Sequence, residues 1–172
     1  MNIVVVAHDP MWSRKFESEA TLVSEVLGSA AVGIHHIGST AIPSLFAKPI
    51  IDILVEGTSL VAVDKRAESL EAHGYEAKGE FGIPGRRYFR KDNAAGIREY
   101  QVHAFVADSD EVDRHLAFRD YLRSHPVVAE KYSQLKRELA MQHPYDIEAY
   151  RDGKDPFIKA TVQVALDWWR SS

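Results

Sequence analysis

The chain has 172 residues, 45% of them hydrophobic and 27% charged, which is typical of one globular domain and unlike a disordered or fibrous protein. Its 21 Lys and Arg residues and 25 Asp and Glu residues give a net charge of −4. A general nucleic-acid binder needs an excess of cations to meet phosphates, so this balance argues against one. The chain has no cysteine, which excludes disulfides and thiolate chemistry and leaves His and carboxylates as ligands for any metal.

The amino-terminal run Met1–Val6 is apolar and lacks the basic lead and the small-residue cleavage site of a signal peptide. We expect a β-strand there. The sequence has neither a run of about 18 apolar residues, which a membrane-spanning helix requires, nor a Gly/Ser-rich or Pro-rich linker between two halves. We therefore expect one domain over residues 1–172, located in the cytoplasm and without a membrane span.

Helices and strands are expected to alternate through the first part of the chain. Asp9-Pro10 is a typical helix start, with Asp as the N-cap and Pro at the first helical position, and Gly28 can end that helix. Runs rich in β-branched residues predict strands, and apolar residues at helical spacing predict helices. In chain order after Gly28, we expect strands over 31–37 and 50–55, a helix over 58–73, and strands over 75–80, 86–91 and 97–106, the last two joined by a turn at 92–96.

The pattern changes to helices from Ser109 onward. We expect helices over 110–124 and 126–141, a short helix near Ile147, and a last helix over 156–169 capped by Asp155. Mixed strands and helices followed by a helical end predict an α/β or α+β fold, in which helices pack on a mixed β-sheet and the carboxyl-terminal part is helical.

The most informative local feature is a Gly-Ser turn followed by an acid in an apolar strand. Gly38-Ser39 ends the strand over 31–37, and a turn of this kind lets backbone N–H groups and a hydroxyl approach a phosphate. Asp52 lies in the apolar run Ile50–Val55, where a carboxylate is costly unless it is hydrogen-bonded, paired or bound to a metal. The alternative interpretation is a structural aspartate bonded to the backbone or to Lys48.

The sequence around these residues resembles the GrpB family, whose members are assigned to the nucleotidyltransferase-like superfamily. The resemblance covers nearly the whole chain and rests on ordered blocks: Asp9-Pro10 with Trp12, the segments 36–43 and 47–53, the segment 115–123 with His125-Pro126, and Tyr132, Lys136, Tyr150, Gly153-Lys154 and Phe157. It implies a nucleotidyltransferase-type core, in which Gly38, Ser39 and Thr40 bind the phosphates of a nucleotide and acids of the adjacent strand hold Mg²⁺.

This sequence departs from the superfamily's pattern of acids. Active members place two acids two residues apart on that strand, so that both side chains lie on one face and hold the metal. Asp52 fits the first position, but Leu54 occupies the second, and Glu56 lies about 7 Å further along. The place of a third acid is held by His103, which we expect to share a metal ion with Asp52 or to act as a general base. The alternative is a histidine with an ordinary structural hydrogen bond. We expect His36 to face the same cleft and assign His35 no role.

Several basic residues are further candidates for binding phosphate. Strand alternation places Arg86 and Arg90 on one face of the segment 86–91, beside Tyr88, where they can bind a phosphate or belong to a solvated edge strand. Arg119 falls within the apolar stripe of its helix and needs an anion, either a structural acid such as Asp120 or a ligand. Lys48 is expected to offset phosphate charge. For Lys136 and Lys154 the default expectation is solvation at the surface.

These features predict a nucleotidyltransferase-type protein that binds an NTP, or another phosphorylated small molecule, together with Mg²⁺, and that transfers a nucleoside monophosphate to an acceptor. In this hypothesis Asp52 and His103 are catalytic and hold the metal, and Gly38, Ser39, Thr40, Lys48, Arg86, Arg90 and Arg119 bind the nucleotide. The alternative is an inactive nucleotidyltransferase-like scaffold that binds a protein partner, which Leu54 favours. Nucleic-acid binding ranks lowest because of the net charge.

Overall fold

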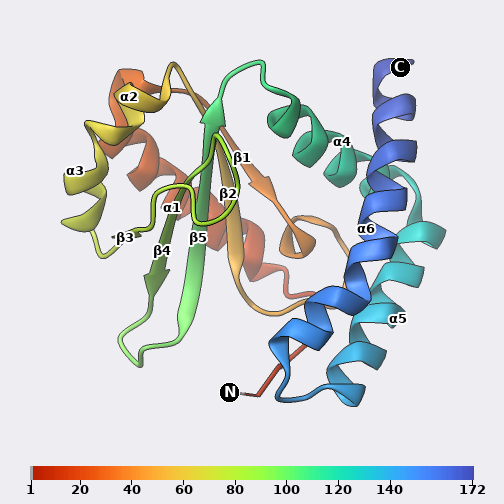
Figure 1. Cartoon of the computed structure of the whole chain (residues 1–172). Coiled ribbons are helices and arrows are strands. Elements are labelled where there is room, and N and C mark those ends of the chain that lie inside the picture. Colours follow the sequence, from red (N-terminus) through yellow and green to blue (C-terminus); the bar gives the residue numbers. More distant parts are fainter. Residues whose placement is uncertain (1) are drawn as a thin grey trace.

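A computed structural model describes residues 2–172 and contains a five-stranded mixed sheet with helices on both faces (Figure 1). The strand order is β1-β2-β5-β4-β3. The central pair β2 and β5 is parallel, and the other neighbours are antiparallel. The predicted mixed sheet is therefore confirmed. The strands are β1 (Ala31–Ile37), β2 (Ile51–Gly57), β3 (Glu76–Ala77), β4 (Arg87–Asp92) and β5 (Arg98–Val106).

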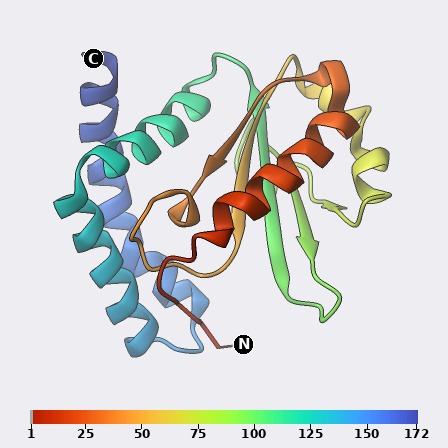
Figure 2. The same ribbon diagram turned by 180° about the vertical axis from the view of Figure 1, so that it is seen from behind.

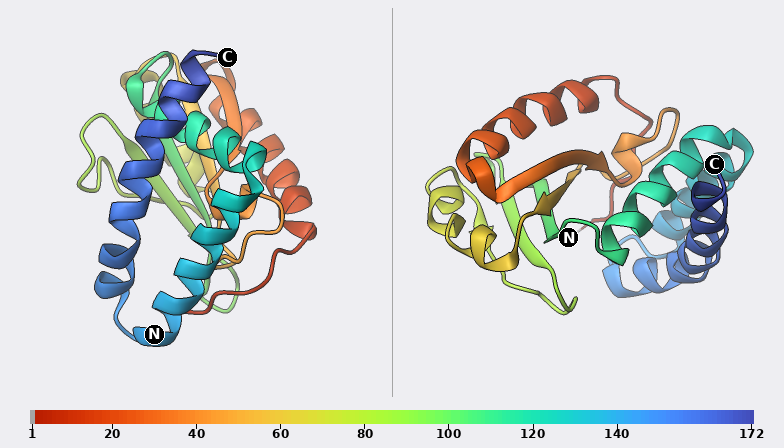
Figure 3. Two further views of the ribbon diagram at one scale, coloured as in Figure 1. Left: turned by 90° about the vertical axis from the view of Figure 1, so that its right-hand side faces the viewer. Right: turned by 90° about the horizontal axis from the view of Figure 1, so that it is seen from above.

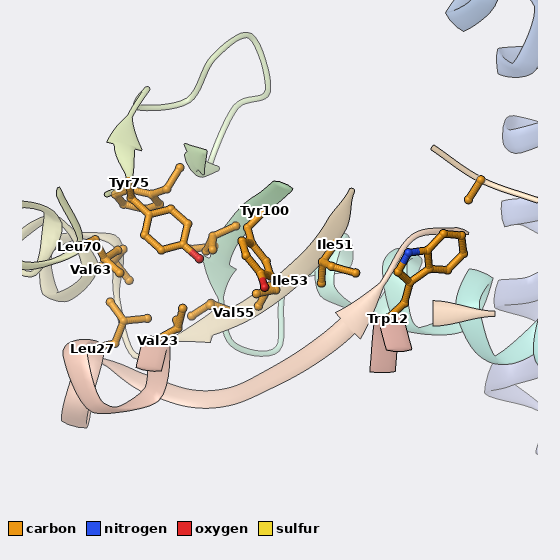
Figure 4. Close-up of a cluster of buried hydrophobic side chains, with 14 residues drawn as sticks. Trp12, Val23, Leu27, Ile51, Ile53, Val55, Val63, Leu70, Tyr75 and Tyr100 are labelled. Carbon is orange, nitrogen blue, oxygen red and sulfur yellow. The ribbon is translucent and has the colours of Figure 1, made fainter. Parts of the chain in front are cut away.

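The main hydrophobic core lies between one face of the sheet and the amino-terminal helices. Helix α1 (Met11–Leu27) crosses this face, as Figure 2 shows from behind. The odd-numbered residues Ile51, Ile53 and Val55 of β2 point toward it because side chains alternate along a strand, and each is at most 1% exposed. Figure 4 shows these side chains packed among residues of α1, of α2 (Leu60–Asp64) and of α3 (Ala67–Glu71).

The opposite face of the sheet meets the carboxyl-terminal helices. These are α4 (Asp110–Ser124), α5 (Pro126–Gln142) and α6 (Ile147–Arg170), which stand together at one side of the sheet (Figure 3). Val112 and Leu116 of α4 pack against Ile37, Leu54 and Phe105. The even-numbered residue Asp52 of β2 therefore lies on the same face as this helical layer, which is the arrangement that builds the site described below.

Three predicted elements differ from the structure in the first half of the chain. The predicted strand Met1–Val6 is wrong for residues 2–5, of which none is in a strand; Val6 forms a single bridge to Ala47, and Met1 lies outside the described residues. The predicted helix over 58–73 is two short helices: the first ends at Asp64, and Arg66, with φ −102° and ψ 0°, is the N-cap of the second. The predicted strand over 75–80 is reduced to β3, residues 76–77, although Lys78 and Gly79 still make backbone hydrogen bonds to Tyr88 of β4.

The last helix also differs from the prediction. The sequence predicted a short helix near Ile147 and a second helix that begins at Pro156, but α6 runs unbroken through Pro156. Its N-cap is Asp146, whose carboxylate accepts a hydrogen bond from the Ala149 amide. This cap, together with the packing of α6 against α4 and α5, offsets the cost of one proline inside the helix. No helix within residues 2–172 is long and apolar enough to cross a membrane.

Candidate active site

The turn after β1 brings the backbone into contact with Asp52. β1 ends at Ile37, the strand partner of Asp52, and Gly38 follows with φ +75° and ψ −175°, a conformation essentially restricted to glycine. A Cβ at Gly38 would stand 2.7 Å from Asp52 Oδ2, so only glycine leaves room for the carboxylate. Ser39 then begins a short 3₁₀ helix, Ser39–Ala41. The predicted Gly-Ser turn and the predicted acid are therefore adjacent in space.

Asp52 of β2, His103 of β5 and Arg86, which directly precedes β4, form a chain of hydrogen bonds. His103 Nε2 lies 2.9 Å from Asp52 Oδ1, and His103 Nδ1 lies 3.3 Å from Arg86 Nη1. A guanidinium can only donate, so Nδ1 accepts and Nε2 carries the proton that His103 donates to Asp52. The remaining Arg86 donors bind the carbonyls of Glu80 and Phe81. His103 thus holds one carboxylate oxygen of Asp52, and Arg86 holds His103 and the loop before β4.

Asp52 lines two cavities at once. We call the first, of about 220 Å³, the lysine cavity; the second, of about 600 Å³, is the apolar cavity. The Asp52 side chain is 26% exposed, so it is open to ligands rather than sealed in the core. The lysine cavity is lined by Ser39, Thr40, Lys48, Gln101, Lys136, Tyr150 and Lys154 among others, and the apolar cavity by Ile37, Gly38, His103, His115, Phe118, Ile158 and Val162 among others.

The lysine cavity concentrates positive charge around buried amines. Lys136 is only 1% exposed, and among residues 2–172 no atom accepts a hydrogen bond from its Nζ. Burial, together with the charges of Lys154 and Lys48, lowers the pKa of Lys136 to about 6. Burial and the charge of Lys48 likewise lower the pKa of Lys154 to about 8, against the opposite effect of Asp52. Burial also lowers the pKa of Lys48. An anion in this cavity would supply the missing partners.

Two tyrosines hold these lysines in place. Lys136 Nζ lies 4.6 Å from the centre of the Tyr132 ring, and Lys154 Nζ lies 4.5 Å from that of Tyr150. Lys48 Nζ lies 5.4 Å from the centre of the same Tyr150 ring. The ring faces contact the amines and stabilise them when they are protonated, but they accept no strong hydrogen bond, so they position the amines without satisfying them.

Not all of the predicted phosphate-binding residues meet at these cavities. Ser39, Thr40 and Lys48 line the lysine cavity, and Gly38 lines the apolar cavity. Arg86, Arg90 and Arg119 line neither; Arg86 contacts His103 and the carbonyls of Glu80 and Phe81 instead. Arg90 pairs with Glu76 at 3.3 Å, and Arg119 pairs with Asp120 at 2.9 Å while donating to the carbonyl of His36. Arg119 thus contacts the structural acid that the alternative named, whereas Arg90 contacts an acid of the neighbouring strand β3 and does not lie on an edge strand.

His36 and His35 lie on opposite faces of β1, and the face predicted for His36 is wrong. His36 was expected to face the cleft, but its ring stacks on Phe16 of α1 at 4.8 Å, and its Nε2 lies 2.9 Å from Thr40 Oγ1. The expectation is wrong because Ile37, not His36, pairs with Asp52 and shares its face. His35 lies on the Asp52 face, where its Nε2 is 2.7 Å from Glu56 Oε2. Glu56 is thus occupied by His35 and is not a second acid at the cavity.

The carboxylates of the site fit a single metal ion better than two. Within residues 2–172, no three His, Asp or Glu side chains gather closely enough to bind a metal by themselves. The second acid position is filled by Leu54, which is fully buried against Ile37 and Phe105. Mg²⁺ is commonly held by one or two carboxylates together with substrate phosphates and water. Asp52, beside a cavity suited to phosphates, fits that donor set.

Comparison with known proteins identifies the family. The family model described as "GrpB protein" matches residues 2–163. The chain belongs to the GrpB family. It is 43% identical to the UPF0157 protein YqkA of Bacillus subtilis over 96% of this chain but only 48% of that protein, so the chain spans about half the length of this relative. It is 35% identical to the glutamate-rich protein GrpB of Alkalihalophilus pseudofirmus, over 91% of each chain.

Solved structures show a distant likeness between the GrpB fold and that of a nucleotidyltransferase. The crystal structure of the conserved protein GrpB from Enterococcus faecalis is 42% identical and superposes with a TM-score of 0.92, over 96% of this chain and 99% of that one. The Cid1 poly(U) polymerase, in a structure described as MgGTP bound, is 13% identical with a TM-score of 0.56, over 80% of this chain and 44% of that one. The GrpB chain therefore has a nucleotidyltransferase-like fold, as the sequence predicted.

Sequence reasoning missed the lysine cavity of the GrpB chain. Lys136 and Lys154 were expected to be solvated, yet Lys136 is among the most buried side chains. The signal that could have found them is a repeated spacing: Tyr132 precedes Lys136 by four residues, and Tyr150 precedes Lys154 by four. Residues four apart share one face of a helix. Two tyrosine–lysine pairs of this spacing on neighbouring helices indicate that both lysines face the interior of the fold, side by side.

Proposed function

We propose that this GrpB-family chain is a nucleotidyltransferase-type protein that binds an NTP with Mg²⁺ and transfers its nucleoside monophosphate to an acceptor hydroxyl. The observation that carries the proposal is the position of Asp52 at the edge of a cavity that contains a buried, unpartnered lysine. A polyphosphate is the ligand that such a cavity fits best, because it offers several anionic oxygens to several amines at once. The likeness to the Cid1 polymerase, described as MgGTP bound, supports the same ligand class.

The residues of the lysine cavity have distinct roles in this proposal. Ser39 and the backbone of its turn bind the β- and γ-phosphates, and Lys48, Lys136 and Lys154 neutralise their charge. Asp52, with the phosphate oxygens, holds Mg²⁺, which when bound supplies positive charge to the phosphoryl group under attack. The hydrogen-bond pattern favours His103 as the residue that positions Asp52, more than the predicted roles of His103 as a metal ligand or a base.

The proposed transfer follows from these placements. The acceptor oxygen forms a bond to the α-phosphorus of the NTP while the bond from that phosphorus to the oxygen bridging to the β-phosphate breaks. The hydroxyl proton passes to the Asp52 carboxylate, which His103 keeps oriented. Pyrophosphate leaves with the electron pair of the broken bond, and the lysines of the cavity stabilise its charge.

Binding is tested by calorimetry with MgATP, the other three Mg-NTPs and inorganic tripolyphosphate. Lys136→Met should weaken tripolyphosphate binding by about 10- to 100-fold, the value of one to two charge-assisted hydrogen bonds. Lys131→Met, at an exposed position of α5, should bind as the wild type does. A bound polyanion raises the pKa of Lys136 again, so binding at pH 7 should take up protons, which titrations in buffers of different ionisation enthalpy detect. No binding of any of these ligands would refute the proposal.

Turnover is tested by pyrophosphate release from the four NTPs with Mg²⁺ and a metabolite extract. Asp52→Asn should abolish release while leaving the fold intact. Glu56→Gln provides the matched control, because Glu56 lies on the same strand and face but contacts His35 instead of the cavities. Equal release by wild type and Asp52→Asn would refute the catalytic role of Asp52.

The scaffold hypothesis rests on one observation, the buried Leu54 at the second acid position. A leucine packed into the cluster of Ile37, Phe105 and Val112 cannot be exchanged for a metal ligand without breaking that cluster. An inactive scaffold would bind polyphosphate through the lysine cavity and release no pyrophosphate from any NTP. The pair of experiments above separates it from an enzyme.

A further inference from the structure

We infer that the apolar cavity is the acceptor site, and that the acceptor is a small, largely apolar alcohol rather than a nucleic acid. This inference rests on the proposed function and adds the substrate class. The single observation behind it is that two cavities of opposite character meet at Asp52, which lines both.

The two cavities follow one another along the same cleft between the sheet and α6. On β5, Gln101 borders the lysine cavity and His103 borders the apolar one, two residues apart on one face. On α6, the lysine cavity is bordered up to Lys154 and the apolar cavity begins at Ile158, about 6 Å further along the helix axis. Asp52 lies where the two cavities join.

The order of the two cavities along the cleft determines which of them holds the nucleotide phosphates and which holds the acceptor. In a phosphoryl transfer the attacking oxygen and the leaving oxygen lie roughly in line on opposite sides of the phosphorus. If pyrophosphate leaves toward the lysines, the attacking hydroxyl approaches from the side of His103 and the apolar cavity. The hydroxyl then meets the Asp52 carboxylate, which accepts its proton in the step already described.

The lining of the apolar cavity indicates the chemistry of the acceptor. Phe118, Ile158 and Val162 supply apolar surface, whereas His103, His115 and Gln163 are polar groups that can orient a hydroxyl. The two cations at the rim are already neutralised on their own helices, since Arg114 pairs with Glu111 at 3.5 Å and Lys159 pairs with Asp155 at 2.8 Å. A nucleic acid would need unpaired cations along its phosphates. The volume of about 600 Å³ suits a small organic molecule.

The inference is tested on the full chain with 2-phenylethanol as the probe, followed by the methyl NMR signals of Ile158 and Val162. The probe should shift these signals and should leave tripolyphosphate binding unchanged. Val162→Trp, which fills the cavity, should weaken probe binding by about tenfold or more and leave MgATP binding intact. Val164→Trp is the matched control, because Val164 lies on the same helix and is 51% exposed. Gln163→Trp, at an exposed position of the cavity mouth, replaces Val162→Trp if that variant does not fold.

Each other outcome has a defined meaning. If the wild type binds MgATP but the probe shifts no cavity methyl signal, the inference fails and the proposed function stands. If Val162→Trp loses MgATP binding but keeps tripolyphosphate binding, the cavity holds the nucleoside and the inference is overturned. Transfer of labelled nucleotide to a short single-stranded RNA would also overturn it. If the probe binds and no NTP does, the proposed function fails and the acceptor assignment fails with it.

Discussion

Replacing the buried Lys136 by methionine, a side chain of similar shape without charge, should make the free protein more stable. The pKa of Lys136, lowered from 10.5 to about 6, leaves the amine neutral in the folded protein at pH 7, whereas in the unfolded chain it is protonated. Deprotonating an amine at pH 7, about 3.5 pH units below 10.5, costs 1.36 kcal/mol per unit, on the order of 5 kcal/mol in all. The Lys136→Met variant avoids this cost.

The gain should also shrink as the pH rises. Between pH 6 and pH 10.5 the unfolded chain binds more protons at Lys136 than the folded protein does, so the free energy of unfolding of the wild type rises with pH over that interval. The advantage of Lys136→Met should therefore fall to about 2 kcal/mol at pH 9. Urea denaturation followed by tryptophan fluorescence at both pH values measures it, with Lys131→Met as the exposed control. The reasoning is refuted if Lys136→Met is no more stable than the wild type at pH 7. It is also refuted if the difference in free energy of unfolding between the two proteins is the same at pH 7 and pH 9.

Gly38→Ala should destabilise the protein by about 1 to 3 kcal/mol, because φ is +75° there. It should also reduce turnover, because the new Cβ would stand 2.7 Å from Asp52 Oδ2 and displace the carboxylate. Wild-type stability of the variant in urea would contradict the first expectation. His36 has a pKa lowered to about 4 by burial first, and then by Arg123 and other charges, so below pH 6.5 the unfolded chain binds a proton that the folded protein does not. Titration of His36 should therefore lower the free energy of unfolding by about 3 kcal/mol between pH 6.5 and pH 4. If His36→Gln loses as much stability over this interval as the wild type, His36 is not the cause. Arg86→Met removes the donor to His103 Nδ1 and the donors to the carbonyls of Glu80 and Phe81. The amides of the loop before β4 should therefore exchange hydrogen faster than in the wild type, and unchanged exchange there would show that Arg86 does not hold this loop.

The order of the elements and the acid of the site could be predicted from the sequence because both depend on local signals. The apolar run around Asp52 predicted a central strand, and β2 has neighbours on both sides. The Gly38-Ser39 turn depends on a backbone conformation that few residues other than glycine adopt, so it too is visible in the sequence. Such features need no knowledge of what lies opposite them.

The parts that the sequence could not predict depend on contacts between distant segments. The alternation of β1 does not reveal which face meets the cleft, and the structure places His36 on the opposite face because Ile37 pairs with Asp52. Whether Lys136 is solvated is decided by α6, which lies beside it only in the folded chain. Arg119 pairs with its neighbour Asp120, as one of the two alternatives predicted, but its second contact, the carbonyl of His36, comes from a distant segment.

The parallel pairing of β2 with β5 has a consequence for how the molecule is synthesised. β2 leaves the ribosome about fifty residues before β5, and during that interval its β5-facing edge lacks its permanent neighbour. An apolar strand with an open edge is a template for association with other chains. Nascent chains that stall before residue 98 should therefore aggregate readily, and the slow step of folding should be the closure of this long-range pairing.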